Sequence, residues 1–287
     1  MPRTSPFKLS CVLSLLILCL SAPGLLAKDA KMKAEEIVAK HLASIGTPEA
    51  RAAARNRVVS GSAQVIFRQG GQGQLPGKSN ILSEGRKVRL GMNFPALDYP
   101  GEQLAFDGEK VMVGQVRPGQ RSPLSNFVYT YDVILKEGFL GGTLSTAWPL
   151  LDLTVRQGKL DYTGLKKVEG KQLHEVKYKA KKGAGDLQVS LYFDAESFRH
   201  VRTQYRLVMP ASMGRRPEES SAQRDTIFTV VEQFDDFKEV DGLTLPHACR
   251  LDLTIEGQSA TVMTDWNISA AQIVHNQQID PKFFIVQ

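Results

Sequence analysis

The stretch from Asp235 to Leu253, DDFKEVDGLTLPHACRLDL, gathers residue types that could do chemistry: five carboxylates, one histidine and one cysteine. Asp241 and Gly242 in its middle form a pair typical of β-hairpin turns, and the residues on either side are expected to be the strands that it joins. Carboxylates at a strand end or turn stay solvated and cost little. The sequence therefore favours a hairpin over a catalytic or metal-binding cluster.

Cys249 and His247 are the one pair in this stretch that could act as nucleophile and base. Residues two apart in a strand point to the same face about 7 Å apart, which is too far for a direct hydrogen bond. An apolar neighbourhood would also raise the pKa of the thiol. We therefore predict that Cys249 is a small buried side chain.

No other pattern in the chain predicts a catalytic, metal or cofactor site. The glycines of QGGQGQ at 69–74 lie between an expected strand end and Pro76, which indicates a hairpin loop instead of a phosphate-binding loop. The histidines are far apart and none has metal-ligand spacing: His41, His174, His200, His247 and His275. Basic residues are scattered, so we expect no nucleic-acid partner, and the protein is predicted to be non-catalytic.

The first 27 residues read as a secretory signal peptide. Arg3 and Lys8 precede an apolar run that ends near Leu20, and a Pro-Gly break argues against an uncleaved anchor. Cleavage near Ala27 would leave residues 28–287 as a single domain, with 34 basic and 30 acidic residues, a formal charge of +4, after two of the 36 basic residues are removed. Cys249 would then be the only thiol, so no intrachain disulfide could form. We expect an exported, periplasmic, soluble monomer that touches membrane surfaces transiently.

The elements that must position these residues are mostly strands. Helical periodicity covers Lys31–Ile45 and a short turn from Pro48, and alternation of apolar and polar residues then begins at Val58. The later predicted strands are Lys87–Met92, Gln103–Phe106, Lys110–Val113, Leu187–Phe193, His200–Met209, Thr226–Phe237, Leu243–Ile255 and Ala260–Ile268. Two helices, Ser125–Glu137 and Thr143–Leu153, are predicted to interrupt this antiparallel meander.

Large apolar residues recur on one face of the predicted strands, so the sheet needs a second sheet or a cavity covered by helices. The predicted lining of an apolar cavity is Phe67, Leu191, Phe193, Tyr205, Leu207, Val231, Leu251, Leu253, Ile255, Val262 and Trp266. The predicted lid is formed by Phe127, Tyr131, Ile134, Leu135, Trp148 and Leu151. The alternative is that the helices simply complete a filled core.

Several stretches together resemble a known family: AEEIVAKHLASIG, LYFDAESFRHVRTQY and FDDFKEVDGLTLP. They are similar to the periplasmic outer-membrane lipoprotein-sorting carriers, the LolA-like superfamily, and most of all to its uncharacterised bacterial branch, over roughly Ala34 to Phe284. The resemblance implies an unclosed antiparallel β-barrel, mainly β with a few helices, with an N-terminal helix and helices covering the concave face. It also implies an apolar cavity for acyl chains and an arginine that acts in switching, for which Arg68, Arg89 and Arg202 are candidates.

Two functions follow from this reasoning. The first is a carrier or receptor that binds a lipid or lipoprotein acyl chain, because burial of each methylene contributes about 0.8 kcal/mol without any special polar group. The second is a structural or interaction module of the cell envelope, which would use the same scaffold to bind another envelope protein. A hydrolase of envelope lipids is the weakest hypothesis, since no nucleophile, base and oxyanion set can be assembled.

Overall fold

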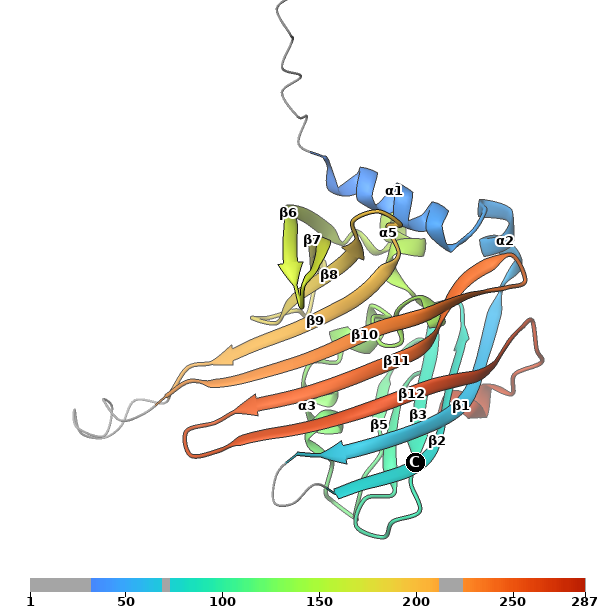
Figure 1. Ribbon diagram of the computed structural model, residues 1–287. Coiled ribbons are helices and arrows are strands. Elements are labelled where there is room, and N and C mark those ends of the chain that lie inside the picture. The colour runs from blue at the N-terminus through green and yellow to red at the C-terminus, as the bar shows by residue number, and fades with distance from the viewer. Residues whose placement is uncertain (1–31, 69–72, 212–223, 287) are drawn as a thin grey trace, which may run out of the picture. The chain divides into compact units, whose positions relative to one another are not determined.

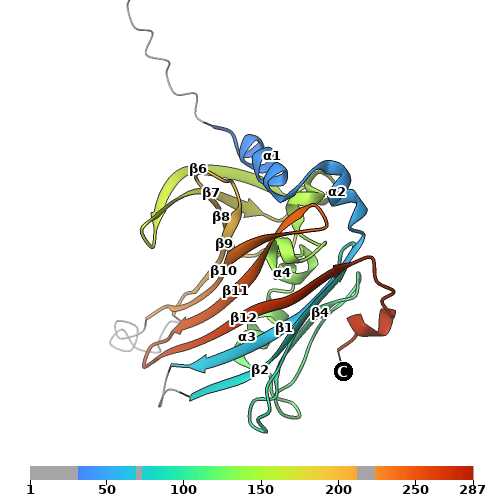
Figure 2. The same cartoon turned by 45° about the vertical axis from the view of Figure 1, so that its right-hand side comes forward.

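A computed structural model describes residues 32–68, 73–211 and 224–286. The predicted signal peptide and residues 69–72 of the predicted glycine loop lie outside the described residues. The strands of the described part form one antiparallel sheet with the spatial order β5-β4-β3-β2-β1-β12-β11-β10-β9-β8-β7-β6. No pairing joins the end strands β5 and β6 in the described part of the chain, so the sheet is unclosed, as predicted, and Figures 1 and 2 show that it is curved.

The twelve strands of the sheet are β1 Asn56–Phe67, β2 Gly73–Glu84, β3 Lys87–Asn93, β4 Gly101–Phe106, β5 Val111–Val113, β6 Lys159–Val168, β7 Lys171–Lys179, β8 Gln188–Asp194, β9 His200–Met209, β10 Thr226–Val240, β11 Leu243–Glu256 and β12 Thr261–His275. Neighbours in the sheet are mostly neighbours in the chain. The exception is the pairing of β1 with β12, which joins the N-terminal and C-terminal halves of the meander.

The stretch that held the most reactive residue types is a hairpin. Strands β10 and β11 pair from Val240 and Leu243 outward. Asp241 and Gly242 between them have φ angles of 52° and 74°. Positive φ at both central residues is the geometry of the hairpin turns that suit twisted strands. The predicted Asp-Gly hairpin is therefore confirmed.

Three strands were not among those predicted: β2, β6 and β7. The first half of β2 is largely exposed and carries Pro76 and Gly77, both of which are unfavourable in strands. Strand β6 is an edge strand without a buried residue, and lysines at 159, 166 and 167 take the place of an apolar alternation. Charged edge strands resist pairing with other chains.

Helices α1 Ala34–Ile45 and α2 Pro48–Ala53 lie across one end of the sheet (Figure 1). Gly46 between them forms a β-bridge with Leu243 at the start of β11, which fixes the helices to the β10–β11 turn. None of the helices in the described part of the chain has the length and apolar character that a membrane crossing needs.

The two predicted central helices are replaced by shorter pieces within residues 122–156, which we term the covering segment. Its elements are α3 Pro123–Thr130, α4 Val133–Lys136, the 3₁₀ turns η1 Gly142–Leu144 and η2 Pro149–Leu151, and α5 Leu153–Arg156. The predicted helix Ser125–Glu137 breaks at Tyr131, and the predicted helix Thr143–Leu153 is wrong. Pro149 explains the second difference, because proline cannot continue a helix that begins before it. A further 3₁₀ turn, η3 Pro281–Phe284, lies near the C-terminus.

Figure 2 shows α3 and α4 inside the curve of the sheet. Apolar side chains of the covering segment and of the concave sheet face belong to one hydrophobic core, which also takes in Ile37, Val38 and Ile45 of α1. The concave face is called the inner face below. The core therefore lies between the sheet and its helical cover.

Candidate functional site

Strand register defines the inner face. Tyr205 lies opposite Val230, which lies opposite Leu253, and Leu251 lies opposite Trp266. Cross-strand partners share a face, so these residues line the same surface. Seven residues of the predicted lining are buried in the core: Leu191, Phe193, Tyr205, Leu207, Leu251, Leu253 and Trp266. Phe67 and Ile255 are half-buried and pack against it, and Val262 is half-buried.

Val231 requires a correction. It lies opposite Gln204 and Asp252, whereas its neighbour Val230 lies opposite Tyr205 and Leu253. Val231 therefore points to the outer face, and Val230 takes its predicted place. The alternation was misleading because the inner face of β10 includes a carboxylate, Glu232, where the pattern leads one to expect an apolar residue.

Most of the predicted lid packs directly onto this surface. Phe127, Ile134, Leu135 and Trp148 are buried in the shared core, and Tyr131 is half-buried against it. Leu151 differs, since it is 40% exposed and lines a cleft beside α2. The covering segment thus fills the inner face with its own side chains.

Buried polar contacts join the covering segment to the sheet. At one end, Glu102 of β4 accepts hydrogen bonds from Ser122 Oγ at 2.7 Å and Ser125 Oγ at 2.6 Å, both at the start of α3. Tyr99 OH donates to the same carboxylate at 2.6 Å. Burial raises the pKa of Glu102, and the three hydroxyls partly offset that rise.

A second carboxylate lies at the middle of the inner face. Glu232 accepts hydrogen bonds from the Gly141 backbone N–H and from Tyr205 OH, each at 2.8 Å. The Gly141 contact ties the loop between α4 and η1 to strand β10. Burial raises the pKa of Glu232 from 4.5 to about 7. Nearby Gly142 has a φ of 50°, and a Cβ there would overlap Phe234, so the loop approaches the sheet as closely as only glycine permits.

Helix α1 supplies the third contact. Trp148 Nε1 of the covering segment donates to His41 Nε2 at 3.0 Å, and His41 Nδ1 is 3.1 Å from the carbonyl oxygen of Phe198. The indole can donate only to an unprotonated Nε2, so His41 is neutral with its proton on Nδ1. Burial lowers the pKa of His41 to about 3, which agrees with this assignment. His200 stacks near Trp148, with ring centroids 4.4 Å apart, and its pKa is also lowered by burial.

Arg57 is the functional candidate that sequence reasoning missed. It lies on β1, is 5% exposed, and donates from Nη1 to the carbonyl oxygen of Thr143 in the covering segment. Its Nε donates to His275 Nε2 at 2.8 Å, and His275 Nδ1 in turn lies 2.8 Å from Asp241 Oδ2. Burial lowers the pKa of Arg57 to about 10.

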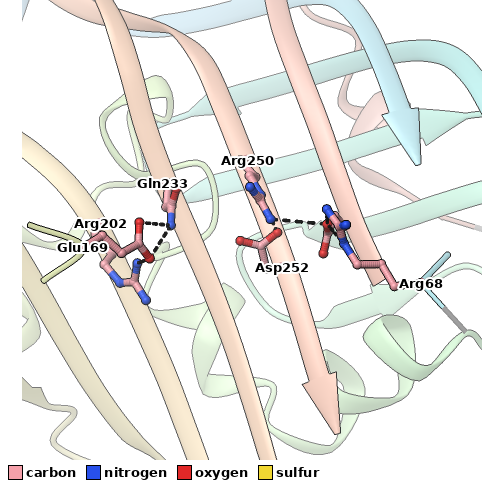
Figure 3. Close-up of polar contacts among 7 residues, drawn as sticks. Arg68, Glu169, Arg202, Gln233, Arg250 and Asp252 are labelled. Atoms are coloured by element: carbon pink, nitrogen blue, oxygen red, sulfur yellow. Dashed lines mark hydrogen bonds and ion pairs between the residues drawn. The ribbon is translucent and has the colours of Figure 1, made fainter. Parts of the chain in front are cut away.

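The three arginines suggested earlier lie elsewhere. Arg202 pairs with Glu169, and Gln233 donates to the same carboxylate (Figure 3). Arg68 pairs with Asp265, and Arg89 donates to Gln103 and to the carbonyl oxygen of Phe283. None of these contacts reaches the covering segment. Two other arginines do donate to it: Arg57 from a buried position, and Arg86 from the surface to the carbonyl oxygen of Lys136.

The reactive residue types that opened the sequence do not assemble into a site. Burial raises the pKa of the Cys249 thiol well above its usual value, so the thiol stays protonated at neutral pH. His247 Nδ1 contacts the carbonyl oxygen of Leu245 instead of the thiol. Across the described ranges, no group of three His, Cys, Asp or Glu side chains is arranged to hold a metal ion.

Comparison with known proteins gives structural likenesses only. No protein-family model and no curated protein matches the chain. A LolA superfamily protein from Nitrosomonas europaea is similar with a TM-score of 0.44 and 11% identity, over 89% of this chain and 98% of the other. An outer membrane lipoprotein-sorting protein domain from Vibrio parahaemolyticus gives 0.43 and 9%, over 87% and 94%. A DUF1329 family protein from Desulfovibrio piger gives 0.39 and 12%, over 88% and 96%. These are the structural similarities that the sequence motifs predicted, at low identity.

Proposed function

We propose that the protein is a non-catalytic carrier or receptor that takes the acyl chain of a lipid or lipoprotein between the inner face and the covering segment. One observation carries the proposal. A separate segment of short helices, not a second sheet, covers the large apolar side chains of the open sheet. Such a cover can move as a unit while the sheet stays intact. The proposal places the mature domain, residues 28–287, in the periplasm after removal of the signal peptide.

The covering segment and an acyl chain would gain comparable free energies by burying apolar surface on the inner face. Undocking four buried side chains, such as Phe127, Ile134, Leu135 and Trp148, costs about 6–12 kcal/mol at about 1.5–3 kcal/mol each. An acyl chain gains about 0.8 kcal/mol for each methylene that it buries, so roughly eight to fifteen methylenes restore that loss. The ligand and the covering segment would therefore compete for the same surface on nearly equal terms. Without a ligand, the closed arrangement is the stable one.

The two tryptophans of the chain allow a direct test, because both are buried in this core. Trp148 belongs to the covering segment and Trp266 to β12. Bromine atoms on an acyl chain quench indole fluorescence on contact, so dibromostearate bound in the core should quench both residues. Trp148→Phe and Trp266→Phe variants would separate the two signals. Stearate without bromine serves as the control for indirect effects.

The expected result is saturable quenching of both tryptophans at a ratio near one chain per protein. Binding of dibromostearate without quenching of either tryptophan would place the ligand outside the core and refute the proposal. An absence of binding, measured by extraction of the lipid from the purified protein, would refute it as well.

The alternative envelope-interaction module requires an exposed apolar edge strand, and neither edge of the sheet offers a long one. At one edge, β6 carries three exposed lysines, and Leu165 is its one large apolar residue that is more than half exposed. At the other edge, β5 is apolar but only three residues long and half-buried. Lysines on an edge strand hinder the addition of a further strand. The observations therefore favour the carrier.

A further inference from the structure

A cleft of about 370 Å³ lies between α2, the start of β1 and the covering segment. Three arginines line it: Arg51, Arg55 and Arg57. No carboxylate is among its lining residues within the described part of the chain, although the protein as a whole has 30 acidic residues. The lining residues of the cleft therefore carry positive charge and no negative charge.

The pairing of these arginines supports this conclusion. Arg51 donates from Nη1 to the carbonyl oxygens of Leu42 and Gly46, which are neutral partners. Arg55 is exposed, and its side chain forms no hydrogen bond or ion pair with any other described residue. By contrast, Arg202 and Arg250 on the outer face each pair with a carboxylate (Figure 3).

Arg57 shows the lack of a negatively charged partner most clearly. Its guanidinium is buried, yet its partners are a neutral imidazole nitrogen of His275 and a carbonyl oxygen of Thr143. The nearest acidic group along this chain of contacts, Asp241, is reached only through His275 and is 69% exposed. A buried cation without a direct counter-ion is costly, and an anion in the cleft would lower that cost.

A second polar group of the cleft also lacks a partner. Thr143 is 5% exposed, and its Oγ1 is buried without a hydrogen-bond partner among the described residues. A buried hydroxyl left unsatisfied costs about 1–3 kcal/mol, so such groups usually await a ligand or water. Thr143 lies next to the guanidinium of Arg57, since that arginine holds its carbonyl oxygen.

The walls of the cleft are apolar and lead into the core. Ile45, Trp148 and Leu243 line the cleft and belong to the hydrophobic core as well. Leu151, the exposed residue of the predicted lid, lies at the same place. A molecule held here by its charged end could therefore place an apolar chain beside Trp148, under the covering segment.

We propose that this arginine cleft binds the anionic head group, a carboxylate or a phosphate, of an amphiphile whose chain enters the core. Arg55 and Arg57 supply the positive charge, and Thr143 Oγ1 donates a hydrogen bond to the anion. This inference rests on the carrier function proposed above and defines its ligand: a singly anionic amphiphile, in preference to a neutral one of the same chain.

The test compares dibromostearate with its methyl ester, which has the same chain but no charge, by quenching of the two tryptophans. Arg57 also holds the covering segment, so Arg57→Gln could fail to fold. Arg55→Gln and Thr143→Val are used instead, because neither removes a side-chain hydrogen bond or ion pair with a described residue. Arg117→Gln, an exposed arginine outside the cleft, is the matched control for loss of one charge.

We expect tighter binding of the carboxylate than of the ester. Arg55→Gln and Thr143→Val should each weaken carboxylate binding about three- to tenfold and leave ester binding unchanged. Arg117→Gln should change neither. Thr143→Val should unfold at the same urea concentration as the wild type or a higher one, because it removes an unsatisfied hydroxyl.

Failure of this inference differs from failure of the carrier proposal. Equal quenching by the carboxylate and the ester, unchanged in all variants, would refute the head-group site and leave the carrier intact. Quenching by neither would refute both. Inorganic phosphate and acetate are tested alone by thermal unfolding. If they stabilise the protein through Arg55 and Thr143 while the amphiphiles show no head-group preference, the cleft binds a small free anion and the proposal is wrong.

Discussion

Glu232 offers a quantitative test of the contact between the covering segment and the sheet. A rise in its pKa from 4.5 to about 7 corresponds to a preference of about 3 kcal/mol for the neutral carboxyl in the folded protein. Between these two pH values the folded protein holds a proton that the unfolded chain has lost. The free energy of unfolding therefore falls as pH rises from 4.5 to about 7, and this contribution is constant above that range.

The perturbation is Glu232→Gln, which keeps the shape of the side chain and cannot ionise. Its amide oxygen can still accept from Gly141 N–H, and Tyr205 OH can rotate to accept from the amide nitrogen. We expect the variant to gain stability relative to the wild type as pH rises. The difference in unfolding free energy between the two proteins should grow by about 3 kcal/mol between pH 4.5 and pH 8.

Urea unfolding followed by tryptophan fluorescence at a series of pH values measures this difference. His41 acts in the opposite direction, because its pKa of about 3 means that stability is lost as pH falls below the unfolded value of 6.5. Both proteins share that effect, so it cancels in the comparison. Glu239→Gln, at an exposed position of the same strand, is the control. A difference between Glu232→Gln and the wild type that does not vary with pH would refute the reasoning.

Three further predictions concern stability and use the same urea assay. Leu253→Ala on the inner face should lower the unfolding free energy by about 2–5 kcal/mol, whereas Thr254→Ala on the outer face should change it by less than about 0.5 kcal/mol. Gly138→Ala should cost more than Gly85→Ala: both have positive φ, but a Cβ at Gly138 overlaps a carbonyl oxygen of the covering segment and one at Gly85 meets nothing. Gly85→Ala should lower the unfolding free energy by only about 1–3 kcal/mol, through backbone strain at its positive φ. Trp148→Phe should cost about 1–3 kcal/mol beyond lost packing because it leaves a buried imidazole nitrogen without its donor. In a double-mutant cycle, Trp148→Phe should therefore cost less in a His41→Ala background than in the wild type, and equal costs in the two backgrounds would contradict the coupling.

The parts of the fold that could be predicted have local signals. Strands β8 to β12 alternate strongly, and the Asp241–Gly242 turn has a residue pair that adopts positive φ readily. Strands β2 and β6 have little apolar alternation, because one begins in an exposed extension and the other lies at the sheet edge. Their pairing partners, not their own sequences, hold them in the sheet. This is why these two strands were not among those predicted.

The site was harder to predict because its contacts join distant parts of the chain. Arg57 becomes buried only through Thr143 and His275, which follow it by 86 and 218 positions. No spacing near Arg57 indicates this role. Val231 was assigned to the wrong face for a related reason, since a buried Glu232 interrupts the apolar pattern beside it. The alternation of apolar and polar residues cannot locate polar side chains inside a core, because it assigns every polar residue to the exposed face.

These buried polar residues also bear on how the cover can open. Each contact described here pairs a group of the sheet or of α1 with one of the covering segment: Glu102 with two serines, Glu232 with Gly141, Arg57 with Thr143, and His41 with Trp148. Desolvation of these groups costs free energy in the closed state, as the raised pKa values of both carboxyls indicate. When the covering segment leaves, water reaches the carboxyls, and that cost is removed. Apolar residues at the same positions would lower the free energy of the closed state further, and exchange with an acyl chain would then cost more. In the proposed carrier, the polar contacts would therefore fix one closed geometry while keeping its free energy close to that of an open state.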